Sequence, residues 1–457
     1  MGESFNQKIS HLYRRAAFGL APWELENQKH VSVSETVDKI FDQAKEINPL
    51  HLDKELQPPP MLDSSSKATI EKFHIETGHF YNQAGFDEDA LNNKWLETMA
   101  GENGGLREKM TLFWHGHFAC MDFVTLYALK LNNTIRANAL GNFRDMVQAV
   151  AMESAMLRYL NNQENVKESP NENFAREVME LFTIGRGNYT EQDVKNAARA
   201  FTGWRAYNNG AFSLNTPKHD YGVKTFMGHS GNFDGSDIIN IILDRKETAH
   251  FIAGKAYKYF VNQENPDQQI IAQLGEKFYS SGYEISVLMH EIFSSDWFYD
   301  PKNMENRIKS PVELLVGLKR DFKLCFDDPE VQIKIQQILG QLLFQPPNVS
   351  GWGGGRNWID STTITERLKL PLAIFYASGS GAAPGKMKNS FDISYFNNKY
   401  HGKPHKELVD GLCKDLVAID IKDNNKKLIA DVVASDTNNP VLAAIMMVTT
   451  LPEYQIC

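Results

Sequence analysis

Apolar residues recur with helical spacing along most of this chain of 457 residues. Val37, Ile40 and Ala44 follow an i, i+3, i+7 pattern that places them on one face of a helix. Ser32 and Glu35 precede them with the spacing of a capping box, which marks a helix start. The same periodicity runs through residues 69–95, 106–121 and 132–163. The pattern therefore predicts a mainly α fold, dominated by one large multi-helix domain.

Two stretches interrupt the helical pattern. Residues 46–66 contain several prolines and serines, which disfavour a helix and predict a surface loop that serves as a linker or a lid. Residues 379–385 are rich in glycine and predict a flexible connection. We therefore expect a main helical domain over residues 1–378 and a small helical segment over residues 386–457 that packs on it.

One region is expected to form strands. Residues 210–215 and 222–228 alternate apolar and polar side chains on either side of Pro217 and Asp220. Proline and aspartate are typical of turns. The sequence therefore predicts a short β-hairpin over residues 211–229, with little strand elsewhere.

Composition limits the classes of function and location. The net charge is −9 and the chain has no long basic run, so nucleic acid is not an expected partner. The longest apolar run, residues 441–451, is too short to cross a bilayer, so no transmembrane span is expected. The first residues have no apolar core of the kind a secretory signal needs. We therefore expect a cytoplasmic protein, or an exported or periplasmic one if a signal was removed.

Residues 169–204 hold an unusual density of polar side chains. Ser169, Pro170 and Glu172 have the order of a capped helix start, with proline at the first helical position. Thr190 begins a second capping pair, with Asp193, and predicts a second helix. The stretch is therefore expected to form two sharply delimited helices.

The first of these helices is predicted to carry a polar face. At about 100° per residue, Asn173, Glu177 and Glu180 fall within an arc of roughly 60°. Arg176 lies beside them. Paired carboxylates can divide acid and base roles or bind a divalent cation. The alternative is a structural network in which Arg176 neutralises one glutamate and Asn173 completes the hydrogen bonds.

His115 and His117 form a second candidate site. Imidazole nitrogens two residues apart can bind a metal from a strand or an irregular turn. On a helix they are about 200° apart, so they could face one metal only if the helix unwinds near Gly116. The alternative is that His117 is a hydrogen-bonded core residue on an apolar face.

A third group lies in the proposed hairpin. His219 and Asp220 can both face a pocket if they sit in a turn, and Lys224 can meet an anionic group. The alternative is a polar turn exposed to solvent.

The glycine-rich stretch 345–363 is the fourth candidate. Its backbone can approach a ligand closely, and Trp352, Arg356 and Trp358 can stack on or bind a carboxylate, phosphate or sugar. It lacks the Gly-Lys-Ser/Thr ending of a phosphate-binding loop. The alternative is an ordered loop that packs its tryptophans on the core.

Several long motifs resemble one known family. They are HLYRRAAFG, LREKMTLFWHGHF, NENFAREVMELFTIGRGNYTEQDVKNAARAFTGW, HDYGVKTFMG, KSPVELLVG, LFQPPNVSGWGGGRNWI and LPEYQ. Together they cover nearly the whole chain and resemble the bacterial family called domain of unknown function 1800. The resemblance implies a mostly helical protein that acts with a phosphatase- or sulfatase-like protein encoded nearby.

The family's motif positions fall on a defined set of residues in this chain. They are His115, His117, Asn171, Glu172, Asn173, Arg176, Glu177, Glu180, His219, Asp220, Lys224, Trp352 and Trp358. His229 departs from the family pattern, which is expected to have glutamine there. We therefore leave His229 out of the predicted site.

The leading functional hypothesis is a hydrolase with these groups around one polar pocket. Glu177 or Glu180 would act as general base, and His115 or His219 as acid or ligand. A divalent metal would be held by His115, His117 and Glu177. The substrate would be bound by Asn173, Arg176, Asp220, Lys224, Trp352, Arg356 and Trp358.

The competing hypothesis is a helical binding or scaffold protein. In that case the polar groups are structural partners of one another, and the tryptophan loop contacts a partner protein or a glycan. The two hypotheses differ in one spatial requirement. Only the hydrolase needs the histidines, glutamates and Asp220 to share a cavity.

Overall fold

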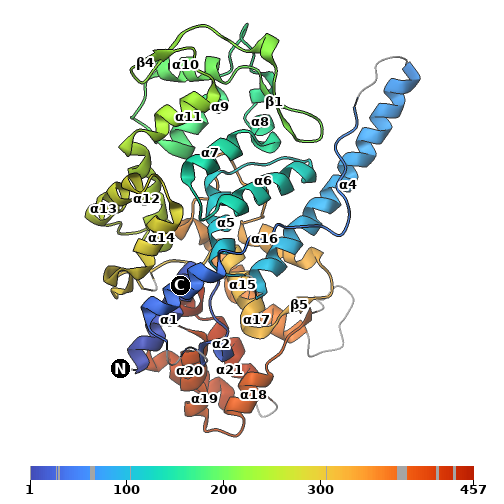
Figure 1. The fold of residues 1–457 in the computed structure, drawn as a ribbon. Coiled ribbons are helices and arrows are strands. Elements are labelled where there is room, and N and C mark those ends of the chain that lie inside the picture. The colour runs from blue at the N-terminus through green and yellow to red at the C-terminus, as the bar shows by residue number, and fades with distance from the viewer. Residues whose placement is uncertain are drawn as a thin grey trace.

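The computed structural model describes residues 2–26, 28, 31–61, 67–102, 104–304, 306–377, 389–417, 421–435 and 439–457. Within this part of the chain, 21 α-helices and three short antiparallel strand pairs form, and 63% of the structure is helical. The mainly α fold expected from the periodicity is confirmed (Figure 1). The glycine-rich connection expected at 379–385 lies outside the described residues.

The helices follow one another with short connections. The first eleven are α1 (Gly2–Ala16), α2 (Pro22–Glu26), α3 (Val33–Gln43), α4 (Lys67–Ala100), α5 (Leu106–His117), α6 (Thr125–Asn138), α7 (Phe143–Ala151), α8 (Ser154–Tyr159), α9 (Asn173–Glu177), α10 (Glu191–Ala200) and α11 (Gly235–Leu243). The others are α12 (Lys246–Phe260), α13 (Gln268–Ser280), α14 (Ile285–Ser294), α15 (Pro311–Phe322), α16 (Glu330–Leu339), α17 (Ser361–Ala377), α18 (Ser394–Tyr400), α19 (His405–Leu416), α20 (Asp423–Ser435) and α21 (Pro440–Thr449).

Two helix starts predicted from the sequence are present as capping boxes, and a third helix start has the same form. Ser32 with Glu35 caps α3, Thr190 with Asp193 caps α10, and Ser310 with Glu313 caps α15. In each box the hydroxyl accepts a backbone N–H three residues on, and the acidic side chain accepts the cap residue's own N–H. Local sequence alone fixes these starts.

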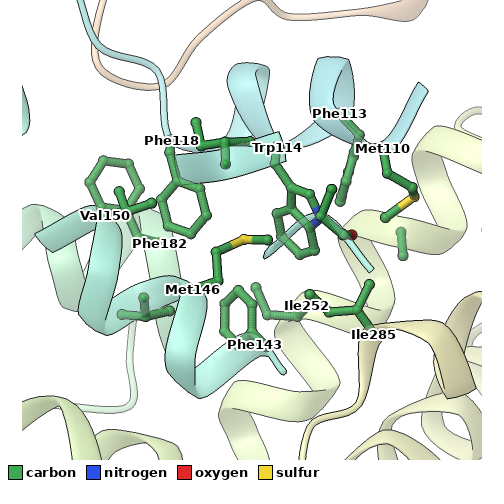
Figure 2. Packing of buried hydrophobic residues seen from close by; sticks show 14 of the residues in the cluster. Met110, Phe113, Trp114, Phe118, Phe143, Met146, Val150, Phe182, Ile252 and Ile285 are labelled. Carbon is green, nitrogen blue, oxygen red and sulfur yellow. The ribbon is translucent and has the colours of Figure 1, made fainter. Parts of the chain in front are cut away.

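Two hydrophobic clusters make up the core. The first joins α1, α3 and the helices from α5 to α14, and Figure 2 shows Trp114, Phe118 and Phe143 packed together in it. The second joins the C-terminal half of α4 with α15–α21. Helix α5 contributes to both, because Met110 faces the first cluster and Leu112 faces the second. Helix α6 does the same through Tyr127 and Ala128, so both helices tie the two halves together.

The C-terminal helices share the second cluster with α15. Leu412 of α19 and Ile445 of α21 are fully buried in the same cluster as Leu315. A strand pair of β5 (Cys325–Phe326) and β6 (Asn389–Ser390) adds a further link. Figure 1 shows α18–α21 at one end of the molecule and α9–α11 at the other, while α4 projects from the body.

The pairing of the predicted hairpin is wrong. Strand β2 (Phe212–Leu214) pairs with the earlier β1 (Trp204–Ala206), and β3 (Lys224–Phe226) pairs with the later β4 (His229–Gly231). Residues 211–229 therefore contain strands from two hairpins and not one hairpin of their own. Each of these two strands pairs across a shorter connection than the one between β2 and β3. The connection between β2 and β3 contains the 3-10 turn Thr216–Lys218.

The predicted start of α9 is also wrong. Ser169 forms an isolated β-bridge with Val166, and the helix begins only at Asn173. The backbone N–H of Asn173, the first of the helix, donates a hydrogen bond to the side-chain Oδ1 of Asn171 at 2.9 Å. Glu172 occupies the cap position without making a side-chain cap. Asn171, which is closer to the helix start than Ser169, therefore accepts the N–H that Ser169 was expected to cap.

Candidate functional site

The predicted polar face lies on a helix that changes type. After α9 the chain continues as a π-helix, Val178–Thr183, before Gly185 ends it with φ +78°. The wider π turn changes the rotation per residue, so the even 100° spacing does not carry from Glu177 to Glu180. The regular α-helical geometry behind the expected arc therefore ends at Glu177.

The polar groups of this face bind separate partners. Arg176 makes two hydrogen bonds to Glu191, at 2.8 and 2.7 Å, and a third to Glu172 at 3.2 Å. It does not pair with Glu177 or Glu180, so that part of the expected network is wrong. Arg176 pairs instead with Glu191 on the next helix, α10. The spacing of residues along α9 could not show this contact.

The other members of the face are also occupied. Glu180 accepts hydrogen bonds from Arg186 and from the Tyr189 hydroxyl, the latter at 2.9 Å. The Asn173 amide donates to the Leu160 carbonyl at 3.2 Å. Glu177 is half-buried, and burial followed by the nearby Glu180 charge raises its pKa.

The His219–Lys224 turn folds on itself. His219 is buried, with Nδ1 2.8 Å from the Thr202 carbonyl oxygen. Asp220 accepts a hydrogen bond from Arg199 Nε at 2.7 Å, and this bond, against a smaller effect of burial, lowers its pKa. Lys224 is buried and donates to the Asp220 and Gly222 carbonyls at 2.5 and 3.1 Å. The charged groups of Asp220 and Lys224 are therefore bonded to Arg199 and to the turn's own backbone.

His115 and His117 do not converge. Helix α5 stays helical through His117, so Gly116 does not unwind it and the two rings point to different sides. His115 accepts a hydrogen bond from the Phe344 N–H at 3.2 Å, and its ring lies 5.0 Å from that of Trp95. Burial, with a smaller effect of Arg136, lowers the pKa of His115 to about 3.

The metal set expected from His115, His117 and Glu177 is not assembled. Over the described residues, no group of three or more histidine, cysteine, aspartate or glutamate side chains is arranged to hold a metal ion. His115 already accepts a backbone N–H, and His117 is bonded at both ring nitrogens. The two imidazoles therefore serve separate hydrogen bonds.

A different site is formed where α5 meets α12 and the 351–358 loop. Here the described residues line a cavity of about 350 Å³, which we call the α5–α12 pocket. Its aromatic walls are Phe113, Tyr259, Trp352 and Trp358. Its polar lining includes His117, Lys255, Lys258, Gln263 and Arg307. Of the groups predicted from sequence, it thus unites His117 with the two tryptophans.

Glycine makes the close approach of the loop to α5 possible. Gly351 has φ +74°, and a Cβ there would lie 2.3 Å from the Gly116 carbonyl oxygen. Trp352 can then pack its ring 5.7 Å from that of His115. The Gly353 carbonyl accepts a hydrogen bond from Gln263 of the segment after α12, at 3.3 Å. The loop therefore closes over the pocket as one of its walls.

Arg356 points away from the pocket. Its side chain is 83% exposed and pairs with Glu264 at 3.1 Å. It is therefore absent from the pocket lining, although the sequence predicted it as a substrate-binding residue.

The charge of the pocket is positive. The lining contains three cationic side chains, those of Lys255, Lys258 and Arg307. The charge of Arg307 is neutralised by Glu313, which lies outside the lining. Among the described residues that line the cavity there is no aspartate or glutamate. Burial, followed by the charge of Lys258, lowers the pKa of Lys255 to about 8.

The comparison with known families agrees with the motifs. The sequence model of a family described as protein of unknown function (DUF1800) matches residues 11–456. The chain belongs to the DUF1800 family. No curated protein and no solved structure matches it. Among the described helices of this DUF1800 protein, none is long and apolar enough to cross a membrane.

Sequence reasoning missed the cations of the pocket. Lys255, Lys258 and Tyr259 follow an i, i+3, i+4 spacing on α12, which places them on one helix face. That spacing was a usable signal. Arg307 offered none, because it comes from an irregular segment and reaches the pocket only through the fold.

Proposed function

We propose that this DUF1800 protein binds a small organic anion with a flat apolar portion in the α5–α12 pocket. The lining carries the proposal: three cationic side chains, aromatic walls and, among the described residues, no carboxylate. A cavity of about 350 Å³ is in the range of about 300–1,000 Å³ usual for small-ligand sites.

The physical reason is the unbalanced charge. Lys255 is half-buried, so its charge is poorly hydrated, and Lys258 is close enough to lower its pKa further. An anion would offset both effects, since opposite charges attract more strongly away from bulk water. Trp352 and Trp358 offer flat faces on which a ring can stack.

Matched ligands test the proposal. Isothermal titration with benzoate and phenyl phosphate, compared with neutral benzamide, separates the charge from the ring. We expect the anions to bind and benzamide to bind at least about tenfold more weakly, since loss of one charge-assisted contact costs about 1.5–3 kcal/mol. Equal affinity for benzoate and benzamide would refute an anion site.

A pair of lysine variants locates the binding. Lys258→Gln removes an exposed pocket cation and is expected to weaken benzoate binding. Lys334→Gln removes an exposed lysine on α16 that pairs with Glu330, outside the pocket. It is the matched control, and benzoate should bind it as it binds the parent protein. If both variants weaken binding equally, the effect is one of net charge and not of this pocket.

A hydrolytic reaction is the second candidate, on one observation. Glu177 is half-buried and its pKa is raised, as a general acid requires. The test is hydrolysis of p-nitrophenyl acetate and p-nitrophenyl phosphate by the parent protein and by Glu177→Gln. A rate in the parent no higher than in the variant would remove this candidate.

The partner implied by the family resemblance fits the same chemistry. Phosphatases and sulfatases act on anions, and a basic pocket would receive such a substrate or its anionic product. Co-purification of the neighbouring gene's product with this chain would support a shared ligand.

A further inference from the structure

Lys255 is held in the α5–α12 pocket by two acceptors. Its Nζ donates to the Leu181 carbonyl oxygen at 2.9 Å and contacts His117 Nδ1 at 3.2 Å. Leu181 lies on the π-helix and His117 on α5, so three elements meet at this amine. The Phe251 ring lies 4.9 Å away and adds an apolar neighbour.

The tautomer of His117 follows from its second contact. Nε2 lies 3.0 Å from the Phe182 carbonyl oxygen, which can only accept, so Nε2 carries the proton. Burial, followed by the Lys255 charge, holds the pKa of His117 well below its usual value. The ring is therefore neutral, and Nδ1 is an acceptor for Lys255.

These contacts orient the amine. A neutral amine has two N–H groups and one lone pair. The Leu181 carbonyl and His117 Nδ1 each accept one N–H of the neutral amine. The lone pair then occupies the only tetrahedral position of Nζ that is not used by Cε or by these two hydrogen bonds. With a pKa of about 8, a substantial part of Lys255 is neutral near pH 8. An amine of this kind is a nucleophile, as lysines beside a second cation in apolar pockets are.

We propose that Lys255 forms an imine with the carbonyl carbon of an anionic aldehyde or ketone bound in this pocket. The inference rests on the anion-binding function proposed above, because Lys258 would hold the acidic group while a tryptophan packs on the remainder. It adds a covalent step and a substrate class to that function, namely oxo acids or carbonyl phosphates.

The step is balanced within the pocket. The Lys255 nitrogen bonds to the carbonyl carbon while one N–H proton passes to the former carbonyl oxygen. The second N–H proton then passes to the same oxygen, which leaves as water, and the C=N bond remains. The unprotonated Nδ1 of His117 lies beside one of these protons and can relay it.

Reductive trapping tests the imine. The probe is phenylglyoxylate, a ketone with a ring and a carboxylate, incubated with the intact protein and sodium cyanoborohydride, which reduces an imine to a stable secondary amine. Peptide mass spectrometry then measures the adduct at each lysine. We expect Lys255 to be labelled about tenfold or more faster than exposed Lys334 at pH 7, because its lower pKa leaves more neutral amine even after its weaker nucleophilicity is allowed for.

The pH profile and a competitor provide a second measurement. Labelling of Lys255 should rise with pH and level off above about pH 8. Excess benzoate should slow labelling at Lys255 only. A purely structural lysine would show neither effect, and equal labelling of both lysines would overturn the proposal.

The two proposals fail in different ways. If benzoate binds in titration but phenylglyoxylate does not label Lys255 preferentially, the pocket binds anions and the imine is refuted. If benzoate does not bind and does not protect Lys255, the anion-binding function is refuted together with the imine that depends on it.

Discussion

The polar cluster around α9 and the α5–α12 pocket differ in how their charges are balanced. Around α9, Arg176 is bonded to two glutamates and Glu180 is bonded to Arg186 and Tyr189. In the pocket, Lys255 has only neutral hydrogen-bond partners. The cluster is denser in charge, yet the pocket is the better candidate site because Lys255 lacks a counter-ion there. Density of polar residues in a sequence is therefore a weaker sign of function than an unbalanced charge in a cavity.

The two histidines of α5 repeat this contrast at close range. His115 turns to Phe344 and Trp95, where its ring is enclosed in the second hydrophobic cluster. His117 turns to Lys255 and is part of the pocket lining. Two positions on one helix thus differ in role because they face different halves of the core.

The largest expected effect comes from the buried pair behind the pocket. Glu313 accepts two hydrogen bonds from Arg307, at 2.8 and 2.9 Å, and one from Lys109. Burial alone would raise its pKa, but these two cations outweigh burial and hold the pKa well below its usual range. Glu313→Gln leaves both cations uncompensated and should destabilise the protein by about 3–5 kcal/mol in urea unfolding.

The control for that variant is Glu191→Gln on the α9 side. Glu191 is exposed, so loss of its ion pair with Arg176 should leave the unfolding midpoint unchanged within error. If Glu191→Gln costs as much as Glu313→Gln, the α9 cluster is the structural centre and the contrast drawn above fails.

The next effect concerns the wall of the pocket. Gly351→Ala should destabilise the protein by about 1–3 kcal/mol and abolish benzoate binding, because the residue has φ +74° and a Cβ would meet the Gly116 carbonyl. Gly353→Ala is the matched control. Its Cβ would meet the exposed Asn357 side chain, which can move. Urea unfolding and benzoate titration on both variants check this prediction, and equal behaviour of the two would contradict it.

The smallest effect is one of pH. The pKa of Asp220 is lowered in the folded protein, first by its hydrogen bond with Arg199, so its contribution to stability is present above the unfolded pKa of about 3.9 and is lost as pH falls. Asp220→Asn should therefore cost about 0.5–1 kcal/mol at pH 6 and progressively less below pH 4. Urea unfolding of parent and variant at pH 6 and pH 3 measures the difference. A cost that does not shrink with acid would mean that the loss is one of packing and not of charge.

The candidate site could be predicted only in part. Trp352, Trp358 and His117 were expected in a binding pocket and do line one. Glu177, Glu180 and the His219–Asp220 pair were expected there too, but none of them lines the pocket. Glu180, His219 and Asp220 are bonded to partners outside it. Lys255 was missed, because its partner His117 lies 138 residues away in the sequence.

The sequence by itself determined the helical class, the capping boxes and the family. Ser32, Thr190 and Ser310 cap their helices because each box closes within four residues and needs no other part of the chain. Tertiary structure decided which charges remain without a counter-ion. Arg176 of α9 pairs with Glu191 of α10. Lys255 is hydrogen-bonded only to the Leu181 carbonyl and the neutral imidazole of His117. Charge balance depends on neighbours in space, and helical spacing along one element cannot supply them.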